Sequence, residues 1–322
     1  MSPPAAPARY AITIPFDGVT LAEHRDWFTR LADLGYSDVW SSEVDGVDGF
    51  TPLALAAAWE ARLRVGLAVA PAFTRGPALL AMSVAAMAEV AGDRFIMGLG
   101  ASSQPVVERW NAVAYDRPYA RTRDVLRFLR RALDNERIDE AFETFAVHGF
   151  RLSRPVTVRP PLLLGALRPR MLRLAGREAD GAILNWLAAS DVARCRDEIG
   201  ADATVAARLF VIPTTDTDTA RAIGRRLISS YLTVGAYAEF HRWLGRAEVL
   251  QPVWDRWSAG DRAGATRAVP DDLVDQLIIH GSFEDCREHV ARYVAGGVDV
   301  PVLAVIPAGV ELADAVAGLA PR

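Results

Sequence analysis

Apolar positions along the chain follow two alternating patterns, one helical and one typical of buried strands. In 21–34 apolar residues recur at helical spacing, and Gly35 ends the segment as a residue suited to a left-handed backbone. A short apolar strand at 38–42 follows. The same order of helix, glycine and strand returns three times: 81–91 with 95–98, 171–179 with 182–185, and 283–295 with 300–305. This repetition predicts a βα architecture.

Short and almost uniformly apolar strands are typical of parallel strands that are covered on both faces. Eight of them begin near residues 10, 38, 63, 95, 161, 182, 204 and 300. Eight such units in 322 residues predict an α/β fold, a single (β/α)8 TIM barrel at 10–322. Residues 1–9, rich in proline and alanine, are predicted to be a disordered lead-in.

Two segments exceed a minimal barrel. Phe142–Leu152 reads as a β-hairpin insertion, and about 217–276 reads as a helical insertion between strands seven and eight. Aromatic side chains gather in the second one: Tyr231, Tyr237, Phe240, Trp243, Trp254 and Trp257. They either pack the insertion onto the barrel or roof its mouth, and the sequence leaves both readings open.

Composition and charge exclude several classes of protein. The formal net charge is −4, so neither nucleic acid nor an anionic membrane is expected as a partner. The sequence has neither an apolar run long enough to span a membrane nor a signal peptide, which predicts a cytoplasmic protein. Cys195 and Cys286 lie far apart and are expected to be free thiols. No His, Cys or carboxylate cluster has metal-ligand spacing, so no metal site is predicted.

The residues that follow the strands are poor in nucleophiles and bases. What they offer is small residues at Gly98, Gly100 and Ala101, and two arginines, Arg168 and Arg170, at a helix start. Small residues allow close approach to the backbone, and a helix N-terminus with guanidinium groups favours an anion. This combination suits a flat anionic cofactor that carries the chemistry itself. A tight loop without a ligand and a solvated helix start are the alternatives.

Several ordered motifs resemble the luciferase-like monooxygenase superfamily and, more narrowly, its F420-dependent oxidoreductases. The match is clearest over the N-terminal two thirds of the chain. The motifs are Leu34-Gly-Tyr-Ser-Asp-Val-Trp40 with Glu43, Leu63–Pro71, Pro77–Ala81, Gly92–Ser102, Arg117-Pro118 with Arg121-Thr-Arg123, and Ala175–Gly181.

The resemblance implies a barrel that holds a deazaflavin, or else FMN, in its mouth, and a homodimer. It implies a non-proline cis peptide at Ala68-Val69 behind the cofactor ring. The strand-four loop would flank the ring, the strand-five loop would take the phosphate, and two residues after strand six would lie beside it. The implied cofactor-binding residues are Ala68, Val69, Gly98, Gly100, Ala101, Ser102, Gly165, Ala166, Leu167, Arg168, Arg170, Asn185 and Trp186.

One position departs from the family pattern. Many F420-dependent alcohol dehydrogenases of this family have an acidic residue followed by histidine after strand two, and this chain has Glu43-Val44. Val44 cannot accept a proton, which argues against alcohol oxidation by a histidine base. Glu43 remains the candidate catalytic residue, as a proton relay, and its alternative role is a buried carboxylate that ties loops together.

The resulting hypothesis is hydride transfer between C5 of reduced F420 and a small organic or natural-product substrate, with reduction of an activated C=C or C=N bond. Glu43, Tyr115 or a bound water would deliver the proton. The alternatives are an FMN-dependent luciferase-like monooxygenase and a non-catalytic barrel subunit.

Overall fold

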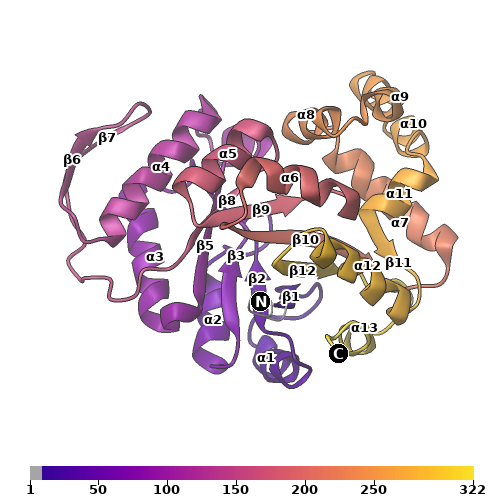
Figure 1. Ribbon diagram of the computed structural model, residues 1–322, viewed down its shortest axis with the longest axis horizontal. Coiled ribbons are helices and arrows are strands. Elements are labelled where there is room, and N and C mark those ends of the chain that lie inside the picture. Colours follow the sequence, from indigo (N-terminus) through magenta and orange to yellow (C-terminus); the bar gives the residue numbers. More distant parts are fainter. Residues whose placement is uncertain (1–8) are drawn as a thin grey trace, which may run out of the picture.

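The computed structural model describes residues 9–322, with an eight-stranded parallel barrel at its centre (Figure 1). Each barrel strand pairs with the next one along the chain, and the ring closes because β12 pairs with both β10 and β1. The barrel strands are β1 (Ala11–Thr13), β2 (Asp38–Ser41), β3 (Arg64–Leu67), β5 (Phe95–Gly100), β8 (Leu162–Gly165), β9 (Gly181–Asn185), β10 (Thr204–Ile212) and β12 (Val300–Val305). The predicted (β/α)8 TIM barrel is confirmed.

Helices cover the outside of the barrel, and their apolar faces pack against the strands in one large buried cluster. The chain begins α4 with Pro118, whose fixed φ suits the first helical position. The covering helices are α1 (His24–Asp33), α2 (Thr51–Trp59), α3 (Pro77–Ala91), α4 (Pro118–Leu133), α5 (Pro169–Glu178), α6 (Val192–Ile199), α12 (Phe283–Ala295) and α13 (Leu312–Gly318), with short helical turns η1 (Gly92–Arg94), η2 (Pro105–Trp110) and η3 (Ala189–Asp191).

Side chains fill the inside of the barrel, so it is a packed core rather than a pore. Trp40 of β2 lies across Gly66 of β3, where an added Cβ would come within 2.4 Å of the Trp40 ring. The inner cluster consists of Ala11, Trp40, Ile96, Leu163, Ile183, Ala206, Val300 and Val302.

The third barrel strand is interrupted where the resemblance placed a bulge. The Ala68-Val69 peptide is cis, as expected. The chain then resumes as the two-residue strand β4 (Ala70–Pro71), which pairs with the end of β5. Val69 therefore projects toward the ends of β5 and β8, where Gly100 and Gly165 make room for it.

The hairpin insertion exists but begins earlier than predicted. Its strands are β6 (Ile138–Ala141) and β7 (Ala146–Phe150), so the predicted strand start at Phe142 lies in the turn. Phe142 and Phe145 stack at 4.8 Å and cover Phe128 of α4. Apolar residues thus occupy the turn because it packs on a helix, which explains why their pattern resembled a strand.

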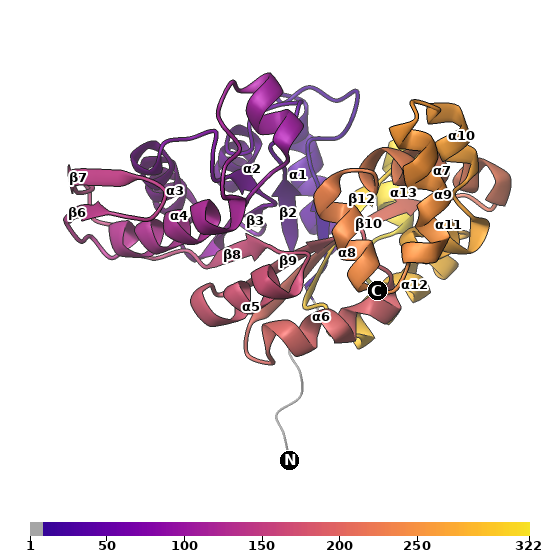
Figure 2. The same ribbon diagram turned by 90° about the horizontal axis from the view of Figure 1, so that it is seen from above.

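The helical insertion lies at the opposite end of the molecule from the hairpin (Figures 1 and 2). It also contains a strand that the sequence analysis missed, β11, which pairs with β10 along residues 210–212. On that edge β9 pairs only with residues 204–208, so β11 continues the sheet where β9 leaves it. The insertion comprises α7 (Thr217–Tyr231), α8 (Gly235–Trp243), α9 (Ala247–Ser258), α10 (Arg262–Arg267), α11 (Asp271–Leu277) and β11 (Ile278–His280).

The predicted disordered lead-in falls outside the described residues except for Arg9, which is held by hydrogen bonds to Asp38. Within residues 9–322, none of the helices combines the length and the apolar character that a bilayer crossing requires.

Candidate functional site

A cavity of about 920 Å³ lies where the C-terminal ends of the barrel strands meet the helical insertion. This is the face on which TIM barrels carry their active sites. Most of the predicted site residues line the cavity, from five different strand ends. They are Glu43, Ala68, Val69, Gly100, Ala101, Ser102, Gly165, Ala166, Leu167, Arg168, Arg170 and Asn185.

Gly98 and Trp186 lie behind the cavity wall. A Cβ on Gly98 would stand 1.9 Å from the Leu67 carbonyl oxygen and 2.5 Å from Ile183 Cδ1. A Cβ on Gly100 would come within 2.5 Å of Val69 Cγ2. For Gly98, which does not line the cavity, the predicted reason of close approach by a cofactor needs correction. Both glycines give room to the interrupted third strand, whose Val69 faces the cavity, and Gly100 lines the cavity as well.

Trp186 forms the back of an aromatic stack under the insertion. Its ring lies 4.2 Å from that of Phe210 and 4.9 Å from that of Tyr231, and only Tyr231 of these three lines the cavity. Its φ of 55° is left-handed, a conformation that bulky residues rarely adopt. Ser102 and Arg117, on the cavity wall, also have positive φ, at 60° and 45°. Unfavourable backbone conformations thus gather around this cavity.

Two exposed arginines stand at the cavity rim where α5 begins. Arg168 is the N-cap residue of this helix, and the Arg170 guanidinium carbon lies 3.8 Å from the centre of the Tyr119 ring. In the described part of the chain, neither arginine forms an ion pair with a carboxylate. Pro169 has no N–H, and the N–H groups of Met171 and Leu172 donate to the Arg168 carbonyl. The two guanidinium groups, with the Arg170 N–H beside them, therefore provide the place for an anion.

Glu43 lies on the cavity wall with both carboxylate oxygens engaged. One oxygen pairs with the Arg75 guanidinium and the other accepts a hydrogen bond of 3.0 Å from the Gly49 N–H. Arg75 in turn lies 4.8 Å from the centre of the Phe50 ring. These contacts hold the 43–50 loop closed, and they suit an ionised carboxylate, which accepts protons in hydrogen bonds and donates none.

Two tyrosines provide hydroxyl groups at the cavity. The Tyr115 hydroxyl donates to the Ser102 carbonyl at 3.2 Å, and burial raises the pKa of Tyr115. The Tyr237 hydroxyl accepts a hydrogen bond of 3.1 Å from Asn185 Nδ2, and burial raises the pKa of Tyr237 to about 12. Both phenols are therefore protonated at neutral pH, and Tyr237 keeps its own proton free for donation.

The sequence analysis did not assign several residues of the cavity wall to the site. Arg208 could have been suspected from the sequence, because it is the one charged residue in the otherwise largely apolar strand 204–212. Tyr231 and Tyr237 were named only as insertion aromatics, and they roof part of the cavity. Phe240 instead packs against the barrel core, and Trp254 packs inside the insertion. The unassigned wall residues with polar or aromatic side chains are Ser42, Ser103, Arg117, Tyr119, Glu143, Arg173, Arg208, Tyr231 and Tyr237.

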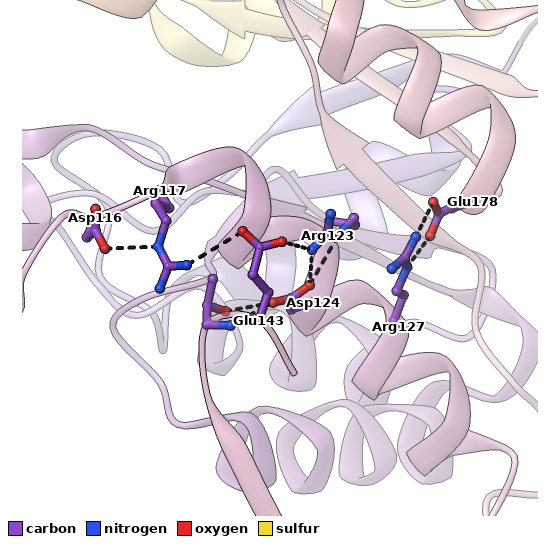
Figure 3. A network of polar contacts seen from close by, with 8 residues as sticks. Asp116, Arg117, Arg123, Asp124, Arg127, Glu143 and Glu178 are labelled. Atoms are coloured by element: carbon purple, nitrogen blue, oxygen red, sulfur yellow. Dashed lines mark hydrogen bonds and ion pairs between the residues drawn. The ribbon is translucent and has the colours of Figure 1, made fainter. Parts of the chain in front are cut away.

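The hairpin turn reaches the cavity through an ion-pair network (Figure 3). Glu143 lies between Arg117, at 3.5 Å, and Arg123, at 2.6 Å, and Arg123 also pairs with Asp124. The network continues into a shallow hollow of about 530 Å³ between α4 and the hairpin. Each arginine of that hollow has an acidic partner: Arg123, Arg127, Arg130 and Arg131. This hollow therefore offers an incoming anion no spare positive charge.

Histidine and cysteine are absent from the cavity wall as described by residues 9–322. His24 and His241 are buried and bonded to backbone groups, and both cysteines are buried free thiols. In the same residues no cluster of potential metal ligands occurs. The chemical resources of the site are therefore arginines, tyrosine hydroxyls and backbone groups around an apolar floor.

Comparison with known proteins gives the family. The model of the luciferase-like monooxygenase family matches residues 5–300. A Mycobacterium tuberculosis protein, whose name assigns it to the coenzyme F420-dependent oxidoreductases, is 27% identical over 315 residues, covering 87% of this chain and 90% of its own.

Two solved structures extend the comparison. The coenzyme F420-dependent tetrahydromethanopterin reductase of Methanopyrus kandleri has a TM-score of 0.78 at 19% identity, with 98% of each chain covered. The oxygenating constituent of 3,6-diketocamphane monooxygenase from Pseudomonas putida, in complex with FMN, has a TM-score of 0.64 at 15% identity, with 97% of each chain covered. At these identities the structural likeness shows the fold alone. Because the family model matches residues 5–300, the chain belongs to the luciferase-like monooxygenase family.

Proposed function

We propose that the protein is an F420-dependent oxidoreductase that transfers a hydride between the deazaflavin C5 and a small organic or natural-product substrate. The observation that carries this proposal is the pair Arg168 and Arg170 at the start of α5, which have no carboxylate partner among residues 9–322. They stand on the rim of a cavity whose described wall contains neither histidine nor cysteine. A binding site of this kind suits an anionic cofactor that supplies the chemistry. The name of the M. tuberculosis relative favours F420 as that cofactor.

The residues present fit such a cofactor. The side chains of Arg168 and Arg170, with the Arg170 N–H, would hold its phosphate. Val69, Ala101 and Ala166 offer an apolar surface for a flat ring, and Tyr231 and Tyr237 would exclude water from above. Reduced F420, when bound, supplies the hydride. Everything else required of the protein is positioning and a proton.

Reduction of an activated C=C or C=N bond leaves a basic atom on the substrate, which needs that proton. We assign its delivery to Tyr115, because its hydroxyl lies on the cavity wall and remains protonated at neutral pH. Glu43, the candidate from sequence, would instead hold the 43–50 loop through Arg75 and Gly49. A homodimer and a cytoplasmic location stay predictions.

Binding titrations of the purified protein with F420 and with FMN test the cofactor. We expect F420 to bind, and a double Arg168→Gln/Arg170→Gln variant to bind it at least about tenfold more weakly, because each lost charge-assisted contact to phosphate costs about 1.5–3 kcal/mol. Arg173→Gln is the matched control, since Arg173 also lines the cavity but already pairs with Glu198 at 2.6 Å.

Three other outcomes would reject the cofactor or its proposed binding site. Tight uptake of FMN with no response to F420 would favour the runner-up, an FMN-dependent monooxygenase, for which the P. putida structure is the precedent. Binding of neither cofactor would favour a non-catalytic barrel. Equal loss of affinity in the Arg173→Gln control would mean that overall charge, rather than the α5 start, attracts the cofactor.

A further inference from the structure

Arg208 is a charged residue on the inner face of an otherwise apolar strand. Along β10 it alternates with Ala206 and Phe210, and Ala206 belongs to the cluster inside the barrel. Its neighbours in register are Asn185 of β9 and Val302 of β12. The side chain reaches the cavity. A guanidinium group therefore lies deep in the site, below the insertion.

No carboxylate among residues 9–322 forms an ion pair with Arg208, and its Nε is buried without an acceptor. The nearest compensation is the Phe210 ring, whose centre lies 5.0 Å from the guanidinium carbon. Arg117 and Arg173, on the same cavity wall, pair with Glu143 and Glu198. A partly buried cation without a partner is costly to maintain, so its retention points to a ligand that supplies the negative charge.

Hydrogen-bonding groups surround this cation. Asn185 donates to the Tyr237 hydroxyl at 3.1 Å, which leaves the phenol proton of Tyr237 free, and Asn185 Oδ1 is buried without a partner. Tyr237 lies close enough to Arg208 for the guanidinium charge to act on its pKa, and burial still keeps this phenol neutral. We call Arg208, Tyr237 and Asn185 the Arg208 corner.

The Arg208 corner is separate from the place expected for the cofactor phosphate. Arg168 and Arg170 follow β8, and the Arg170 guanidinium lies over the ring of Tyr119 in α4. The strand β9 lies between β8 and β10 in the barrel. The cavity thus has cationic side chains in two places, at the end of β8 and on β10.

We propose that the Arg208 corner binds a carboxylate of the substrate, so that the substrates of this enzyme are small carboxylic acids. A planar guanidinium group matches a carboxylate with two parallel hydrogen bonds, and Tyr237 adds a third donor. A single cation at this position balances a monoanion, whereas a phosphate dianion would leave negative charge uncompensated. The term substrate rests on the proposed function, but carboxylate binding can be measured without any cofactor.

Isothermal titration calorimetry of the cofactor-free protein tests the proposal. The affinities of benzoate, cinnamate and crotonate are each compared with that of the corresponding neutral amide. We expect at least one acid to bind about tenfold or more tightly than its amide. Arg208→Gln should abolish this preference, Arg208→Lys should retain part of it, and Arg168→Gln/Arg170→Gln should leave it intact. Arg208→Met keeps the test valid if the Gln variant folds poorly, and its melting temperature should not fall, since it removes an unpaired charge.

Three results would overturn the proposal. The first is no preference for any acid over its amide in the wild type, and the second is a preference that survives both Arg208→Gln and Arg208→Met. The third is a loss of F420 affinity in these variants, which would assign the guanidinium group to the cofactor. A titration with F420 alone reports separately on the proposed function, so failure of one assignment is distinguishable from failure of the other.

Discussion

Tyr115 and Glu43 lie on the wall of the same cavity, yet their contacts suit different tasks. The carboxylate of Glu43 is shared between Arg75 and the Gly49 N–H. The hydroxyl of Tyr115 makes one hydrogen bond to a carbonyl, and its ring packs 5.0 Å from that of Phe73. A residue that fastens a loop contributes to stability, and one that gives a proton to the substrate contributes to turnover.

Two variants should separate these contributions. Glu43→Gln is expected to lower the free energy of unfolding in urea by about 1–3 kcal/mol, because Arg75 loses the nearer of its two carboxylate partners and keeps only Asp48, at 3.8 Å. Tyr115→Phe should leave stability nearly unchanged and lower kcat for F420H2 oxidation, with a panel of enones and imines, by about a hundredfold or more.

Asp45→Asn is the control for the first variant, since Asp45 is exposed in the same loop and should tolerate the change. A large loss of kcat in Glu43→Gln with unchanged stability would restore Glu43 as the proton relay. Full activity of Tyr115→Phe would remove Tyr115 from the mechanism.

Among the elements, the interrupted third strand imposes the strictest demands on its neighbours. The Leu67 carbonyl approaches Gly98 so closely that β5 must carry a glycine there, and Val69 makes the same demand of Gly100. Gly100 and the residues after it line the cavity, and the room that both glycines give to the third strand was not predicted from the sequence. The backbone atoms that crowd a glycine of β5 belong to the neighbouring strand. The sequence of β5 alone therefore cannot predict this contact.

Gly98→Ala is therefore expected to destabilise the protein by about 3 kcal/mol or more, since the new methyl group would collide with backbone that cannot move aside. Gly46→Ala is the matched control: nothing lies within 4 Å of its added Cβ. Thermal and urea unfolding of both variants measure the difference. Equal stability of the two would mean that the β3–β5 contact is looser than the structure has it.

The two insertions show which elements can be predicted from local sequence periodicity and which cannot. The helices at 217–276 were predicted because each has its own apolar periodicity. The strand β11 and the start of the hairpin at Ile138 were not, since each is short and defined by its partner. A three-residue strand has too few positions for a period, and its pairing with β10 is a tertiary fact.

At the scale of the molecule, a buried histidine makes one of the contacts between the helical insertion and the barrel. His241 of α8 donates from Nε2 to the Trp186 carbonyl at 2.9 Å, and its Nδ1 is buried without a partner. Protonation would place a donor at Nδ1 with no acceptor. Burial, with a smaller contribution from Arg246, lowers the pKa of His241 to about 3.

This lowered pKa predicts acid sensitivity of the whole fold. In the unfolded chain His241 binds a proton below about pH 6.5, whereas in the folded protein it stays neutral down to about pH 3. The free energy of unfolding therefore falls as the pH drops through this window. The His241→Gln variant can still donate a hydrogen bond to Trp186. As the pH falls, its free energy of unfolding should decrease less steeply than that of the wild type, with a difference in slope of up to about 1.4 kcal/mol per pH unit.

Urea unfolding between about pH 7 and pH 5 measures this slope. His148→Gln, on the exposed hairpin strand, is the control and should follow the wild type. His289, whose pKa burial lowers to about 4, remains in all three proteins and contributes equally. Parallel curves for wild type and His241→Gln would contradict the prediction.

The barrel follows from the amino-acid order alone, because each strand and helix has its own period of apolar residues and few folds accommodate that order of units. The strand ends were predicted to form the site, and twelve of the predicted residues lie on the cavity wall. The three-dimensional fold was needed to show that Gly98 and Trp186 lie behind that wall, that Glu43 pairs with Arg75, and that Arg208 has no acidic partner among residues 9–322. The buried face of a helix or strand can be predicted from its own apolar positions. The partner of a charged group cannot, because it depends on which distant side chains the fold brings close to it.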